Sequence, residues 1–307
     1  MLRVWMQDSV PPTTRYRERP GRWVGEDRWP STNVEMRAYP LARGRLLAPG
    51  ERSDDPPATV QSPLTVGLFA GKWCSYSATP DLPHDQREED GGALVFDSEP
   101  LAEDLELLGA PELEVEVTSD RPVALLAARL SDLAPDDRAT RVTYGLLNLT
   151  HRDGHEQPRP LEPGRPVRVR LRLNGIAQNF PAGHRLRLAL STSYWPMAWP
   201  PPEPVRLTVA LAGCRLLLPV RPPRPEDRAL RPLGEPVTAP PLKKTQLTTT
   251  HHNWWVKRDL ENDVATLEVI KDEGTYRIEE IDLAITDRTQ EWYSSREDDF
   301  GSARGVA

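Results

Sequence analysis

Histidine and cysteine are the side chains in this sequence best suited to acid–base, nucleophilic or metal chemistry, and their spacing supports none of the three. His151 and His155 lie four residues apart, which suits a metal on a helix, but the intervening Arg-Asp-Gly is typical of a turn. His184 opens a strand-like segment, where a structural histidine bonded to the backbone is expected more than a base. Cys74 and Cys214 are far apart in sequence, so reduced thiols are predicted rather than a disulfide framework.

The short motifs that hold catalytic groups in other enzymes are also missing from the sequence. It contains no Gly-x-Ser-x-Gly turn for a hydrolase serine, no Gly-rich phosphate loop and no His-Glu-x-x-His zinc motif. The acidic run Glu88–Asp90 is typical of a solvated loop, and no spaced acidic loop indicates calcium. Arginine far outnumbers lysine, which we attribute to codon usage rather than to an arginine site. The residues alone therefore predict no catalytic residue, no metal site and no cofactor.

Aromatic residues gather in a proline-constrained segment directly after a strand-like run. Tyr194, Trp195 and Trp199 are candidate ligand-facing or interface aromatics, because large rings give much contact area at little entropic cost. A proline-rich loop that covers one end of the fold explains the same residues. A carbohydrate- or peptide-binding platform built on Trp195 and Trp199 is therefore one hypothesis, and structural cover is the other.

Period-two alternation of apolar and charged residues dominates the middle of the chain and must position these side chains. It runs through 112–118, 166–173 and 184–190, with charged residues on one side and leucine or valine on the other. Such alternation is typical of strands with one buried and one solvated face. With 33 Pro against 19 Gly, a helical bundle is excluded. The sequence predicts an all-β sandwich of two sheets.

The two flanks differ from this sandwich in composition. Residues 1–33 hold one short strand followed by a segment with tryptophans among charges, and residues 34–222 hold the sandwich. Residues 223–307 begin with a proline-rich connector, which is predicted to be stiff and extended. They continue with a small antiparallel β appendix, for which strands are predicted at 254–259, 265–271, 275–285 and 289–294.

The charge balance excludes some partners. The net charge is −7 and the isoelectric point is near 5.5, which argues against a protein that tracks nucleic-acid phosphates. No run approaches the roughly 20 apolar residues of a membrane span, and the first residues lack the pattern of an export signal. A cytoplasmic location without nucleic-acid or membrane partners is predicted.

Seven runs of the sequence occur in an order that is typical of one enzyme family. They are Asp85–Arg87, Leu94–Gly109, Arg129–Asp132, Tyr144–Leu147, Leu161–Gly164, Asn179–Arg185 and Ser191–Pro196. Together they resemble the C-terminal region of cocaine esterase-like and Xaa-Pro dipeptidyl-peptidase-like serine hydrolases, the CocE/NonD family. The resemblance implies a jelly-roll (galactose-binding-like) β-sandwich, preceded at 1–33 by a remnant of an α/β-hydrolase domain. It also implies that the intact enzyme hydrolyses esters or Xaa-Pro dipeptides.

The family's catalytic serine, acid and histidine have no counterpart in this chain, so the chain alone is expected to be inactive. The family segment that lines the acyl pocket resembles Val66–Gly71. The resemblance therefore implies Leu68 and Phe69, and more weakly Trp73, as substrate-wall residues of the intact enzyme. Plain sandwich core explains the same apolar run equally well.

The implied partner is an α/β-hydrolase catalytic domain, supplied by an upstream segment or by a separate chain. Without that domain, Val4, Trp5 and Met6 are expected to form an exposed apolar patch that promotes self-association. The rival to this view is a stand-alone β-sandwich module that binds carbohydrate or peptide.

Overall fold

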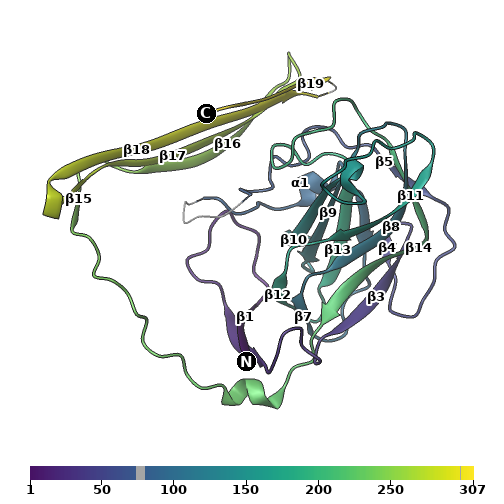
Figure 1. Cartoon of the computed structure of the whole chain (residues 1–307), viewed down its shortest axis with the longest axis horizontal. Coiled ribbons are helices and arrows are strands. Elements are labelled where there is room, and N and C mark those ends of the chain that lie inside the picture. The colour runs from purple at the N-terminus through teal and green to yellow at the C-terminus, as the bar shows by residue number, and fades with distance from the viewer. Residues whose placement is uncertain (74–79, 298) are drawn as a thin grey trace.

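The computed structural model of the chain describes residues 1–73, 80–297 and 299–307. Almost all regular structure in that part is β (Figure 1). Two sheets pack face to face as a sandwich, and a separate antiparallel sheet follows at the C-terminus. The all-β sandwich with a C-terminal antiparallel appendix, which the sequence predicts, is confirmed.

The two layers of the sandwich are joined where β3 pairs with β4. The first layer contains, in spatial order, β10 (Ala139–Asn148), β9 (Leu125–Leu133), β13 (Arg185–Ser191), β6 (Leu94–Asp97) and β4 (Arg45–Leu46). The second layer contains β11 (Pro166–Arg172), β8 (Glu112–Ser119), β14 (Leu207–Val220), β5 (Ala58–Val60), β3 (Glu35–Ala42), β7 (Leu105–Gly109), β12 (Ile176–Phe180), β1 (Leu2–Gln7) and β2 (Gly21–Glu26).

The core lies between these layers and follows the predicted alternation. Along β8, Leu113, Val115 and Val117 point inward and are at most 3% exposed. The glutamates between them face outward, and Glu116 pairs with Arg168 of β11. β8 thus buries one side and solvates the other, as expected for a two-layer β protein, whereas every residue of β9 is buried.

Helical structure among the described residues is limited to short pieces. These are α1 (Arg87–Asp90) and the 3-10 turns η1 (Leu149–His151), η2 (Pro225–Ala229) and η3 (Glu279–Ile281). None of these helices is long and apolar enough to cross a membrane.

The N-terminal strands β1 and β2 form a hairpin that extends the second layer through β12. Met6 is fully buried in this hairpin and packs with Val24, while Trp5 is half-buried and lies edge-on to Trp23 at 5.4 Å. The exposed patch predicted from Val4, Trp5 and Met6 is therefore wrong for Met6, because β2 and the sheet close over it. The domain boundary predicted after the first 33 residues does not coincide with a break in this sheet.

The C-terminal sheet is built around one long strand. It contains β15 (Lys244–Gln246), β16 (His251–Asp259), β17 (Val264–Ile278), β18 (Leu283–Arg296) and β19 (Asp299–Val306). β17 pairs with β16 and β15 along one side and with β18 along the other, and β19 pairs with β18. The strand break predicted at 272–274 is wrong, because a bulge there keeps the chain within β17 and the turn lies at η3 instead.

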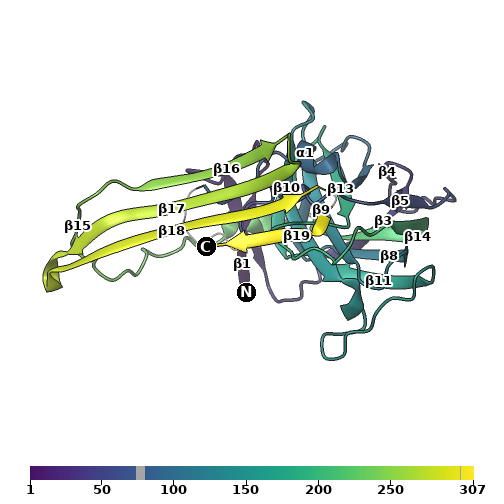
Figure 2. The same ribbon diagram turned by 90° about the horizontal axis from the view of Figure 1, so that it is seen from above.

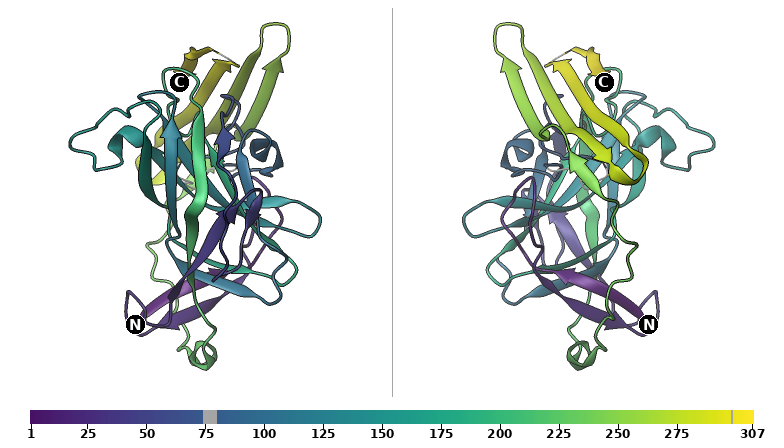
Figure 3. Two further views of the ribbon diagram at one scale, coloured as in Figure 1. Left: turned by 90° about the vertical axis from the view of Figure 1, so that its right-hand side faces the viewer. Right: turned by 90° about the vertical axis from the view of Figure 1, so that its left-hand side faces the viewer.

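The connector and the C-terminal sheet reach well outside the sandwich. The connector leaves the sandwich at η2, near the N-terminal hairpin, and runs to β15 at the projecting end of the C-terminal sheet (Figure 1). Every residue from 231 to 250 is exposed. Figure 2 shows β19 and the adjoining strand ends over the sandwich, while the β15 end projects beyond it. The two side views in Figure 3 show the same sheet crossing one end of the sandwich.

Candidate functional site

A loop at residues 64–71, which we call the wall loop, is held in place by one buried carboxylate. Glu89 of α1 is 1% exposed and accepts hydrogen bonds from the backbone N–H groups of Gly67 and Phe69, the latter at 2.7 Å. Gly67 has a φ of +123°, and a Cβ there would lie 2.2 Å from the carbonyl oxygen of Trp195. Only glycine fits this conformation and this close approach. The wall loop is therefore locked against the Trp195 backbone.

A network of ion pairs next to Glu89 holds α1 in place. The Arg129 guanidinium, 0% exposed, donates to an Asp90 carboxylate oxygen at 3.0 Å, and Arg187 joins Asp90 to Asp97 at 3.0 and 2.7 Å. Burial raises the pKa of both Glu89 and Asp90, although the neighbouring guanidiniums oppose that effect. Hydrogen bonding to Asp97 in turn raises the pKa of Arg187. The network fixes α1, and through it the wall loop, on the first layer of the sandwich.

The aromatic segment after β13 lies mostly inside the fold. Tyr194 is fully buried, and its hydroxyl oxygen accepts a hydrogen bond from Arg141 at 2.6 Å. Trp195 is 1% exposed, and its ring lies edge-on both to Trp199 at 4.9 Å and to Tyr293 of β18 at 6.0 Å. Of the three predicted aromatics, only Trp199 has a free surface, with 68% of it exposed. Trp195 is an aromatic of the interface between the sandwich and the C-terminal sheet.

The three predicted wall residues have different surroundings. Leu68 is 1% exposed, because it packs in an apolar cluster with Leu267 and other side chains of β17. Phe69 is half-buried at the edge of the same cluster. Trp73 is 69% exposed and lies edge-on to Tyr144 at 6.2 Å. The structure thus brings Leu68 and Phe69 under the C-terminal sheet and leaves Trp73 open.

Among the described residues, the histidines and Cys214 form no recognisable reaction centre. His184 pairs through Nδ1 with the Asp132 carboxylate at 2.7 Å, so its partner is a side chain of β9 rather than the backbone bond that was expected. His151 and His155 lie against each other at an exposed turn. Cys214 is a buried free thiol whose pKa is raised by burial, and Cys74 lies outside the described residues. Within the described ranges no group of His, Cys, Asp and Glu could hold a metal ion.

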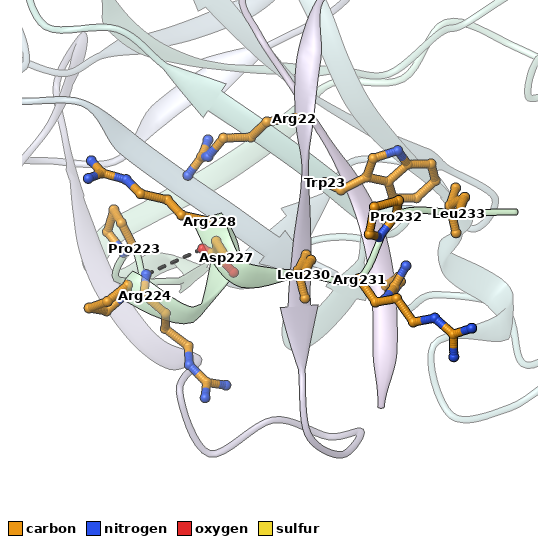
Figure 4. Close-up of a pocket in the computed structure, with 12 residues that line it drawn as sticks. Arg22, Trp23, Pro223, Arg224, Asp227, Arg228, Leu230, Arg231, Pro232 and Leu233 are labelled. Atoms are coloured by element: carbon orange, nitrogen blue, oxygen red, sulfur yellow. Dashed lines mark hydrogen bonds between the residues drawn. The ribbon is translucent and has the colours of Figure 1, made fainter.

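A pocket of about 850 Å³ lies between the N-terminal hairpin and the start of the connector (Figure 4). Arg22, Arg224 and Arg228 lie at one side of it, and Trp23 lies at the other. Arg22 pairs with Glu106, and Arg224 pairs with three carboxylates of its own neighbourhood.

The remaining arginines of this pocket, Arg3, Arg228 and Arg231, have no carboxylate partner among the residues that the structure describes. Unpaired guanidiniums beside an indole suit an anionic group. Sequence reasoning missed this pocket because the arginines were attributed to codon usage. Their crowding at 224, 228 and 231 was the signal that could have found it.

These features define an all-β sandwich with a rigid loop and an aromatic segment covered by the C-terminal sheet. In the described part of the chain, no serine, threonine or cysteine side chain hydrogen-bonds a histidine, so no nucleophile–base pair is assembled there. A family model described as the X-Pro dipeptidyl-peptidase C-terminal non-catalytic domain matches residues 6–253, and the chain belongs to that family. The resemblance to the C-terminal region of CocE/NonD hydrolases is thereby confirmed.

Curated relatives are named as esterases. Two proteins named as serine esterases, from Mycobacterium bovis and Mycobacterium tuberculosis, are each 27% identical over 207 residues, which cover 60% of this chain and 32% of theirs. The cocaine esterase of a Rhodococcus species is 27% identical over 116 residues, or 37% of this chain and 20% of its own. The chain spans at most about a third of the length of these relatives.

Solved structures agree on the fold. An α-amino acid ester hydrolase has a TM-score of 0.53 and 20% identity, over 60% of this chain and 36% of its own. An aminopeptidase from a marine sediment Thaumarchaeota archaeon also has a TM-score of 0.53, with 17% identity over 65% of this chain and 38% of its own. The matched family residues end at 253, so β17, β18 and β19 lie outside them.

Proposed function

We propose that this chain is the structural C-terminal part of a serine hydrolase that cleaves esters or Xaa-Pro dipeptides. The catalytic serine, acid and histidine are supplied by an α/β-hydrolase domain, as an upstream segment or a separate chain. The observation that carries the proposal is the match of residues 6–253 to a domain described as non-catalytic. The names of the relatives, serine esterase and cocaine esterase, support the class of reaction.

In this role the sandwich buttresses the catalytic domain and the wall loop forms part of the acyl pocket. The surroundings of the three wall residues give each of them a different role in this pocket. Trp73 is 69% exposed and is free to touch an acyl group or the catalytic domain. Phe69 offers part of its ring, and Leu68 supports the loop by packing on β17.

Reconstitution tests the proposal. The purified chain is assayed alone and together with the α/β-hydrolase domain, using p-nitrophenyl butyrate and a Xaa-Pro p-nitroanilide as substrates. We expect no hydrolysis and no labelling by a fluorophosphonate with the chain alone, and activity when both parts are present. Turnover by the chain alone that a fluorophosphonate abolishes would contradict the proposal.

The wall is tested in the reconstituted enzyme with a matched pair of tryptophans. Trp73→Ala is expected to raise KM for a bulky acyl ester several-fold while leaving turnover of an acetyl ester nearly unchanged. Trp199→Ala, which removes an indole that is 68% exposed, serves as the control. Equal effects of the two variants on KM would argue against a wall role for Trp73.

The alternative, a stand-alone module that binds carbohydrate or peptide, needs two accessible indoles. Trp195 is 1% exposed and lies between Trp199 and Tyr293, so a single indole is left for such a platform. No observation specifically favours this alternative. Quenching of tryptophan fluorescence by sugars at millimolar concentration would revive it.

A further inference from the structure

One face of the C-terminal sheet is covered at one end. Residues directly opposite each other on antiparallel strands lie on the same face of a sheet, and Leu267 of β17 is opposite Tyr293 of β18. These two side chains, together with Ala265 and Val269, pack around Leu68 of the wall loop. We call this the inner face of the C-terminal sheet.

Beyond the sandwich the inner face continues with only partial cover: Tyr276, Ile278 and Ile285 are half-buried, and the Lys244 ammonium lies 4.5 Å from the centre of the Tyr276 ring. The bulge at 272–274 absorbs one residue, after which Tyr276 is opposite Ile285 and Ile278 is opposite Leu283. All four residues are aromatic or aliphatic, and Leu283 is 46% exposed. Figures 1 and 2 show that this end of the sheet projects past the sandwich. The same face is thus buried by the wall loop at one end and only partly covered at the other.

The connector segment 231–243, which we call the strap, also carries exposed apolar side chains. Every residue of the strap is exposed, including Leu233 at 57% and Leu242 at 52%, and Val237 is fully exposed. Its prolines keep it extended between η2 and β15 (Figure 1). A stiff segment that carries aliphatic side chains but buries none of them on its own fold is suited to lie on a partner.

We propose that the partly covered end of the inner face and the strap bind the α/β-hydrolase domain, which is thereby held between the sandwich and the C-terminal sheet. This inference rests on the function proposed above, because it takes the catalytic domain as the occupant. This partly covered surface continues the interface that the sheet already makes with the wall loop. The curated relatives are about three times as long as the part that this chain matches.

A second copy of the chain is a poorer occupant for electrostatic reasons. Residues 223–307 contain 17 acidic and 12 basic residues, a net charge of −5. Pairing two such segments brings like charges together, which disfavours association.

Photo-crosslinking tests the inference. The chain, or the longer polypeptide where the catalytic segment precedes it, is expressed in the source organism with p-benzoylphenylalanine at Ile285 on the inner face. The control carries the same group at Thr286, whose side chain lies on the opposite face. After illumination, cross-linked species are probed with a biotinylated fluorophosphonate, and the cross-linked peptides are sequenced.

We expect the group at Ile285 to cross-link an α/β-hydrolase segment at least tenfold more than the group at Thr286. Equal cross-linking from both faces, or cross-linking only to a second copy of this chain, overturns the inference. Ile285→Lys should likewise weaken co-purification of the labelled hydrolase about tenfold, with Thr286→Lys as control. Unchanged hydrogen exchange in the wall loop then shows that the variant is folded.

This outcome is distinguishable from failure of the proposed function. If a fluorophosphonate-labelled hydrolase accompanies the chain but never cross-links from Ile285, the inference is overturned and the proposed function stands. If no labelled hydrolase accompanies the chain at all, the proposed function fails and the inference fails with it.

Discussion

Removing the Leu68 side chain tests whether apolar contact holds the C-terminal sheet on the sandwich. Leu68 is 1% exposed, and its contacts on the far side are Ala265, Leu267 and Val269, each at most 5% exposed. Burying a leucine or valine side chain contributes about 1.5–3 kcal/mol. The three large aliphatic side chains of this cluster therefore supply roughly 4.5–9 kcal/mol before ordering costs are subtracted.

Besides this cluster, the Trp195 ring contacts Tyr293 across the interface, and the ion pair there is weak. The pair between Arg258 and Glu88 spans 3.7 Å, and both side chains are more than half exposed. Such surface pairs contribute about 0–1 kcal/mol. Leu68→Ala, which costs about 2–5 kcal/mol at a buried site, thus removes a large share of the docking free energy. A loss of about 2 kcal/mol corresponds to a roughly thirtyfold change in the docking equilibrium.

Hydrogen exchange measured by mass spectrometry reads this change directly. A single sheet without a covering layer buries little apolar surface, so undocking exposes β17 to exchange. In Leu68→Ala we expect amide exchange within 264–270 to accelerate about thirtyfold or more, while exchange in β8 and β14 stays unchanged. Thr266→Ala, on the opposite face of β17, is the control. The reasoning is refuted if Leu68→Ala and Thr266→Ala give the same exchange rates in β17.

Three further predictions concern buried charges and backbone. Arg221→Ala should lower the free energy of unfolding by about 3–5 kcal/mol in urea denaturation, because it leaves unpaired the buried carboxylates that lie 2.6–3.3 Å from the Arg221 guanidinium. Arg228→Ala, at an exposed arginine, should change the free energy of unfolding by less than about 0.5 kcal/mol. Burial raises the pKa of Glu89, so the folded chain holds the carboxyl proton of Glu89 more tightly than the unfolded chain does. The resulting stabilisation of the fold is complete below the unfolded pKa of about 4.3. It is lost as the pH rises through the raised pKa of the folded chain. Unfolding measured across this window should show a smaller dependence on pH in Glu89→Gln than in the parent chain, and an identical dependence would count against the assignment. Gly67→Ala, at a φ of +123° and with no room for a Cβ, should destabilise the chain by more than about 1 kcal/mol in thermal unfolding, and a neutral result would show that the wall loop is not locked.

Local pattern was sufficient to predict most of the sandwich. In a strand with one solvated face, the alternation of apolar and polar residues shows both the length of the strand and its buried side. For this reason the predicted strands at 112–118 and 166–173 coincide closely with β8 and β11. The break predicted at 272–274 failed for a non-local reason. Whether a bulge continues a strand depends on the register with β18, and that register is set by pairing rather than by the residues of the bulge.

The site was harder to predict because its contacts join segments that are distant in sequence. The cover over Leu68 comes from Leu267, and the contact of Trp195 with Tyr293 joins segments that are equally remote. His184 was expected to bond to the backbone, but antiparallel pairing of β13 with β9 places the Asp132 carboxylate beside it. Hydropathy patterns identify which side of a strand is buried, but they do not say what buries it.

The exposed strap allows two copies of the chain to exchange their C-terminal sheets. An extended segment of 13 residues spans up to roughly 43–47 Å and makes no contact that ties its C-terminal sheet to its own sandwich rather than to a neighbour's. The contacts around Leu68 are the same whether β17 comes from one molecule or from the other. Domain exchange between two copies therefore needs no contact that the monomer lacks, and the protein concentration sets how much swapped dimer forms. A freshly concentrated sample should contain swapped dimers that return to monomers slowly after dilution.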